Sequence, residues 1–148
     1  MIRVSPTPFD PQAETAAFAA DHTEAGALAS FVGVCRSETG AVTALHLDYY
    51  PGFTESEITR IEAEARARFA LIDTLVIHRC GMVRPGEPIV LVAVLAAHRK
   101  PALQAVDFLM DYLKTGAPFW KRETGPDGER WIEPRADDYE AREQWKDK

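Results

Sequence analysis

Residues 88–101 read PIVLVAVLAAHRKP, and this stretch decides the fold class. It contains an unbroken apolar run of nine residues, 89–97, that follows a proline. Because the run is apolar on both faces, it predicts a central β-strand. Pro101 then opens a segment in which apolar residues recur at helical spacing as far as Gly116, a typical helix end. A buried strand that leads almost directly into a helix is therefore expected at the heart of the fold.

The remaining elements are predicted outward from this pair. Asp10 and Pro11 predict the start of a helix, and residues 54–57, TESE, match a capping box that predicts another. Further strands are expected over residues 27–36, 42–50, 75–79, 117–123 and 129–133, the first two joined by a turn and the last two as a hairpin. This order indicates an α+β fold, with mixed or antiparallel sheets and about three helices, rather than a doubly wound sheet.

Length and composition are those of one domain. The chain has 148 residues, 46% of them hydrophobic, which is enough to close a core. Its longest apolar run is well short of the roughly 20 residues that cross a bilayer, and the first ten residues show no secretory signal, so a cytoplasmic location is expected. Two cysteines build neither a disulfide framework nor a four-cysteine zinc site. The domain is expected over residues 1–135, with 136–148 as a polar tail, and no metal or cofactor is expected.

The net charge of −6 disfavours nucleic acid and anionic membranes as partners. Residues 98–135 nevertheless hold seven basic and six acidic side chains, whereas the rest of the chain is predominantly acidic. This distribution favours binding of a small anion, although ordinary solvated surface would show the same balance.

The candidate site residues are cations at the ends of predicted elements. Arg36 ends a strand, His98 and Arg99 lie between a strand and a helix, Lys114 ends that helix, and Lys121 follows seven residues later. Two amines held close together repel each other, which lowers the pKa of an ammonium and frees a neutral amine. Arginine stays charged and binds phosphate or carboxylate through paired hydrogen bonds. The set suggests lysine-assisted acyl or sulfur transfer on an anionic substrate, without selecting it from other chemistries.

Each candidate also has a structural interpretation. Lys114 suits a helix C-terminus because it complements the helix dipole. Lys121 and Arg122 can lay their aliphatic stems over neighbouring aromatic rings. His98 can be satisfied locally at a helix start. Only a structural role is expected for His46, His78 and Cys80, and Cys35 is expected to be an inert buried thiol.

Residues 113–123, LKTGAPFWKRE, resemble the large, catalytic subunit of the molybdopterin synthase family. The resemblance covers about residues 2–135 and implies an α/β-hammerhead-like fold. The Lys-x₆-Lys spacing that ends in WKRE is its most specific feature. Shorter segments follow in the family's order: FVGVCR at 31–36, YPGFT at 50–54, IHRCG at 77–81, PGE at 85–87 and AHR at 97–99.

The resemblance implies a sulfurtransferase. Members of this family convert cyclic pyranopterin monophosphate, or precursor Z, into molybdopterin by inserting two dithiolene sulfurs. The sulfur arrives as a thiocarboxylate on the C-terminal Gly-Gly of a small ubiquitin-like subunit. A heterotetramer is implied, in which a central homodimer of large subunits carries one small subunit at each end.

The resemblance also implies roles for individual residues. Lys114 and Lys121 match the family's catalytic lysines. Lys114 is expected to assist acyl transfer or to bond briefly to the partner's terminal carbonyl, and Lys121 to stabilise developing negative charge. His98 is also able to transfer protons. Substrate binding is expected from both lysines and from Val34, Cys35, Arg36, His98, Arg99, Arg122 and Glu123, with Arg135 as a further pocket-lining residue.

Two alternatives stay open. The chain could be a non-catalytic anion-binding or assembly protein of the same fold, or a hydrolase that depends on Cys35, which ranks last because no motif supplies a base. Departures from the family pattern lie beside the motifs and put fine substrate positioning in doubt: they are Cys80, Lys100 and Leu103.

Overall fold

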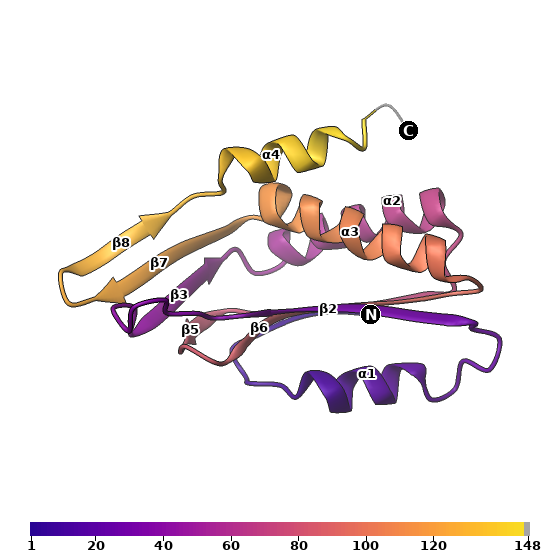
Figure 1. The fold of residues 1–148 in the computed structure, drawn as a ribbon, viewed down its shortest axis with the longest axis horizontal. Coiled ribbons are helices and arrows are strands. Elements are labelled where there is room, and N and C mark those ends of the chain that lie inside the picture. The colour runs from indigo at the N-terminus through magenta and orange to yellow at the C-terminus, as the bar shows by residue number, and fades with distance from the viewer. Residues whose placement is uncertain (147–148) are drawn as a thin grey trace.

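The predicted central strand forms β6 (Pro88–Ala96), which is buried from Val90 onward. In the computed structural model, β6 lies inside a four-stranded sheet of order β1-β4-β6-β2. It pairs antiparallel with β2 (Ala27–Val34) and β4 (Asp73–Arg79), while β1 (Ile2–Ser5) runs parallel to β4. The prediction of a strand that is apolar on both faces is confirmed, because helices cover both sides of this sheet (Figure 1).

The structure describes residues 1–146. Helices α2 (Phe53–Phe69) and α3 (Arg99–Gly116) lie on one face of the first sheet, and α1 (Pro11–Ala19) lies on the other (Figure 1). Asp10 caps α1 as predicted, since its side chain accepts from two backbone N–H groups. None of the described helices is both long and apolar enough to cross a membrane. The main core lies under α2 and α3 and includes Ile58, Ile61, Val92, Phe108 and Leu109.

A second sheet of order β5-β3-β7-β8 extends beyond the ends of the first. It contains β5 (Gly81–Val83), β3 (Ala44–Tyr49), β7 (Phe119–Gly125) and β8 (Gly128–Ile132), all antiparallel. The predicted β7–β8 hairpin is confirmed. Strands β2 and β3, joined by a turn in sequence, lie in different sheets, because β2 pairs with β6 along its whole length.

The predicted capping box at residues 54–57 is wrong. Helix α2 begins at Phe53, and its N-cap is Gly52, whose φ of 82° lets the chain turn directly into the helix. The carboxylate of Glu55 accepts the Gly52 N–H at 2.7 Å. Thr54 is instead fully buried and accepts the Tyr50 N–H at 3.1 Å.

A fourth helix, α4 (Ala136–Glu143), forms where a polar tail was expected, so the described part of the chain has four helices rather than about three. Trp145, just beyond α4, explains why this segment is folded, because its ring is buried edge-on against Phe108 and Phe69. Its indole Nε1 donates to Asp111 of α3 at 2.7 Å. The last two residues of the expected tail, 147–148, lie outside the described residues.

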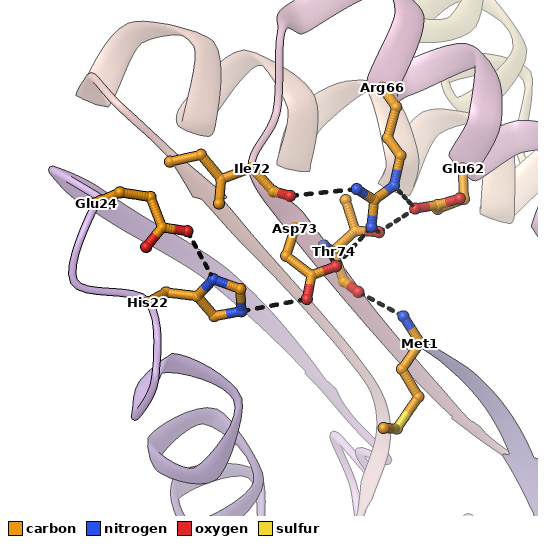
Figure 2. Close-up of polar contacts among 8 residues, drawn as sticks. All are labelled: Met1, His22, Glu24, Glu62, Arg66, Ile72, Asp73 and Thr74. Carbon is orange, nitrogen blue, oxygen red and sulfur yellow. Dashed lines mark hydrogen bonds and ion pairs between the residues drawn. The ribbon is translucent and has the colours of Figure 1, made fainter.

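A polar network joins three elements at the end of the first sheet where β4 begins (Figure 2). Arg66 of α2 donates to Asp73 at 2.6 Å and to Thr74 at 3.1 Å, and it also pairs with Glu62. His22, in the loop after α1, contacts the other oxygen of Asp73 at 3.3 Å. These contacts fix the start of β4, while its opposite end lies at the candidate site.

Candidate active site

Lys114 and Lys121 reach one pocket from two different elements. Lys114 lies in the last turn of α3, and Lys121 lies on β7, which begins shortly after α3 ends. Both side chains line a hollow of about 350 Å³, which we call the lysine pocket. The structure therefore brings together the two amines that the sequence places seven residues apart. Other lining residues include His78, Phe119, Ile132, Arg135, Asp138 and Tyr139.

A second hollow of about 230 Å³, the side pocket, is lined by the same two lysines. Residues that follow β2, where the chain leaves the first sheet, also line this pocket. A larger hollow of about 510 Å³ lies at the tip of the β7–β8 hairpin and contains neither lysine. Four further residues expected at the site line the side pocket: Val34, Cys35, Arg36 and Glu123.

The register of β7 decides which residues face the pockets. Successive side chains of a strand point to opposite faces, so Lys121 and Glu123 share one face and Arg122 takes the other. Arg122 pairs there with Asp48 at 3.5 Å and with Glu129 at 3.0 Å. Arg122 therefore lines neither pocket, although the resemblance places it among the substrate-binding residues.

A buried hydroxyl fixes the chain segment that joins Lys114 to Lys121. Thr54, at the start of α2, donates to the carbonyl of Pro118 at 3.1 Å. Pro118 lies between the end of α3 and the start of β7. The bond ties this connection to a third element and so restrains the separation of Lys114 and Lys121.

The two lysines influence each other electrostatically. Burial lowers the pKa of Lys121, and the nearby charge of Lys114 lowers it further. Asp138 opposes both effects, and its carboxylate lies 3.5 Å from the Lys114 Nζ. The mutual repulsion expected from the sequence is therefore present, and it makes a neutral amine at Lys121 easier to reach.

His78 is a pocket residue that the sequence analysis missed. It lies on β4, and its ring stacks on Phe119 with centroids 3.9 Å apart. Its Nδ1 donates to the Arg79 carbonyl at 2.7 Å. Burial, together with the charge of Lys121, lowers the pKa of His78 to about 4, so the ring is neutral at pH 7. The hydrophobic pattern around His78 indicates only a core strand. The IHRCG segment at 77–81 is the one sequence feature that could have pointed to His78 as a site residue.

Cys35 is unsuited to act as a nucleophile. Its thiol is buried and lies 3.9 Å from the Val83 carbonyl. Burial raises the pKa of this thiol, and the carboxylates of Glu87 and Glu123 raise it further. Since the thiolate is the reactive form, this environment argues against the hydrolase alternative.

The cations at the edges of the site differ in position. Arg36 is largely exposed and pairs with Glu38 at 2.7 Å. Arg135 lies at the N-cap of α4 and lines the lysine pocket. His98 and Arg99 lie at the start of α3 and line neither pocket. Fifteen residues of helix, or about 22 Å, separate Arg99 from Lys114.

Comparisons with known proteins identify the family and the fold. A family model described as MoaE protein matches residues 4–116. The molybdopterin synthase catalytic subunit of Caulobacter vibrioides is 50% identical over 145 residues, covering 98% of this chain and 97% of that protein. The solved molybdopterin biosynthesis MoaE protein of Burkholderia ambifaria has a TM-score of 0.84 at 47% identity, covering 98% of this chain and 97% of that one. Molybdopterin synthase from Staphylococcus aureus has a TM-score of 0.80 at 27% identity, covering 87% and 94%.

Proposed function

The chain belongs to the MoaE family, and we propose that its lysine pocket is the place where a molybdopterin synthase transfers sulfur. As the catalytic subunit, it converts cyclic pyranopterin monophosphate into molybdopterin by inserting two dithiolene sulfurs. The observation that carries the assignment is that Lys114 and Lys121 line the same hollow. A site of this kind needs one amine for acyl chemistry and a second positive charge beside it.

The two pockets suggest separate places for the sulfur donor and for the substrate phosphate. The C-terminal thiocarboxylate of a small ubiquitin-like subunit enters between the lysines. Lys114 assists acyl transfer or bonds briefly to the terminal carbonyl carbon, and the Lys121 ammonium stabilises negative charge on the carbonyl oxygen. When the Lys114 bond forms, the C–S bond of the thiocarboxylate breaks and the sulfide passes to the substrate, where it displaces an oxygen substituent. Water then cleaves the acyl–lysine bond, which frees the amine and leaves a carboxylate on the small subunit. Arg36 in the side pocket supplies a charged fork for the substrate phosphate.

We further propose that a second copy of the chain completes the site. Within one chain, the length of α3 keeps His98 and Arg99 too far from the lysines to share a small substrate with them. Within residues 1–146, no strand pairs with the outer edge of β2, and such edges readily pair with another chain. A homodimer with one small subunit at each end gives the heterotetramer. The exposed apolar residues of β2 are Leu28, Phe31, Val32 and Val34.

The test is a reconstituted reaction. Purified chain, thiocarboxylated small subunit and precursor Z are mixed, and the dithiolene product is measured by mass spectrometry. Lys114→Ala is expected to lower the rate by about 100-fold or more, because it removes a group that acts on the reacting carbonyl. Lys146→Ala, at an exposed lysine paired with Glu143, is the control and is expected to leave the rate unchanged.

Circular dichroism and partner binding should be the same for both variants. Full activity of Lys114→Ala would contradict the assigned role. No product from the unsubstituted chain would favour the anion-binding or assembly alternative. The cytoplasmic location and the domain boundary at residue 135 stay predictions.

A further inference from the structure

A carboxylate from α4 faces the lysine pocket. Asp138 Oδ1 lies 3.5 Å from the Nζ of Lys114, and the Asp138 side chain is only 20% exposed. Its other oxygen, Oδ2, accepts the backbone N–H of Arg135 at 2.8 Å. This capping bond orients the carboxylate independently of the lysine.

Helix α4 is itself held firmly on α3. Asp111 accepts the Trp145 indole at 2.7 Å and the Gln144 amide at 3.1 Å. The guanidinium of Arg142 lies over the Tyr112 ring, 4.6 Å from its centroid. Contacts at the C-terminal end of α4 therefore hold the helix on α3, and the bond to the Arg135 N–H orients the Asp138 carboxylate, so its position does not depend only on its attraction to Lys114.

The charges around Lys121 come from several elements. Lys114 faces it from α3, His78 from β4, and Asp138 from α4, while Glu123 follows on β7 itself. Arg36, Glu133 and Arg135 line the same two pockets. Burial and Lys114 lower the pKa of Lys121, and Asp138 raises it. At pH 7 His78 is neutral and adds no charge.

We propose that Asp138 is a positioning residue for sulfur transfer, which holds the Lys114 side chain at the pocket and offsets its charge so that Lys121 keeps its ammonium beside it. The inference rests on the proposed function. Asp138 lies beyond residues 4–116, the part of the chain that the family model matches.

The test compares two substitutions in the same helical turn. Asp138→Asn removes the charge and keeps an oxygen that can accept the Arg135 N–H, so α4 should stay folded. Asp137→Asn makes the same change in net charge at an exposed neighbour that lines neither pocket. Asp138→Ser, whose hydroxyl oxygen is also an acceptor for the Arg135 N–H, provides the second variant if the first does not fold.

The first measurement is the pH profile of product formation at saturating small subunit. Asp138→Asn should be roughly two- to tenfold slower at pH 7, in line with the loss of one partly buried ion pair. Its alkaline limb should also move to lower pH, because Lys121 loses the charge that raises its pKa. Asp137→Asn should follow the unsubstituted profile. Identical profiles for the two variants would overturn the proposal.

A second measurement needs no catalysis. The acetylation rate of Lys121 in the free subunit is followed against pH by mass spectrometry, since only the neutral amine reacts. The Lys121 titration should move to lower pH in Asp138→Asn and stay in place in Asp137→Asn. Equal titrations would overturn the inference even if the enzyme is active. Lack of product from the unsubstituted chain would instead count against the proposed function and leave this test valid.

Discussion

Single residues in the lysine pocket have pKa values below their ordinary ones. Burial lowers the pKa of both Lys121 and His78. Groups with shifted pKa values cluster at functional sites because catalysis needs pKa values matched to each group's task. The KTGAPFWK segment pointed to both lysines from the sequence. His78 was missed because its hydrophobic surroundings indicate only a core strand, although the IHRCG segment contains it. Asp138 was missed because it lies in an apparent tail and belongs to no local pattern.

The state of His78 predicts a stability change with pH. Its pKa is about 4 in the folded chain and near 6.5 when unfolded, so the unfolded chain binds more protons between these values. The free energy of unfolding should fall as the pH drops from 6.5 to about 4, by up to roughly 3 kcal/mol. Urea unfolding at pH 7 and pH 4.5 measures the loss.

His78→Asn should reduce this loss, because the amide can still donate to the Arg79 carbonyl but does not titrate. His46→Asn is the control, since His46 lies on β3 outside both pockets, and it should retain the full loss. The prediction fails if all three proteins lose the same free energy between the two pH values.

At the scale of elements, local signals predicted strands and helices but not their partners. The apolar run of β6 and the helical periodicity of α3 can be read from residues close together in sequence. Both elements are confirmed by the structure. The turn after β2 shows that the chain bends, yet it does not show that β3 joins another sheet. Helix α4 depends on Trp145 bonding to Asp111, 34 residues away in sequence, which no local window contains.

The length of α3 predicts complementation between inactive variants. Lys114→Ala and Arg99→Ala chains should each be inactive alone. We expect each site to take its lysines from one copy and Arg99 from the other. Random mixing then makes about half of the dimers heterodimers, each with one intact site out of two. Roughly a quarter of full activity should therefore return. Reconstituted product formation after co-refolding measures the recovery.

A mixture of Lys114→Ala with Lys121→Ala is the matched control. Both substitutions fall in the lysine half of the site, so no mixed dimer contains an intact site and no activity should return. Absence of recovery in the Lys114→Ala and Arg99→Ala mixture would show that Arg99 does not act across a dimer.

In the whole molecule, the site lies where separate layers meet. Lys114 comes from the helices over the first sheet, Lys121 from the second sheet and Asp138 from α4 (Figure 1). Although the chain carries a net charge of −6, the two hollows at this junction are lined by four cations, Arg36, Lys114, Lys121 and Arg135, beside three carboxylates. The α+β class and the family could be predicted from the sequence. The meeting of these layers could not, because it depends on strand pairing between distant segments.

A crystal structure of this chain with its thiocarboxylated small subunit bound tests sulfur transfer in the lysine pocket. The terminal carbonyl of the Gly-Gly tail is expected within hydrogen-bond distance of the Nζ atoms of Lys114 and Lys121. A tail that ends elsewhere, for example among the exposed Tyr50, Trp120 and Trp131 side chains, with both lysines facing solvent, would contradict it.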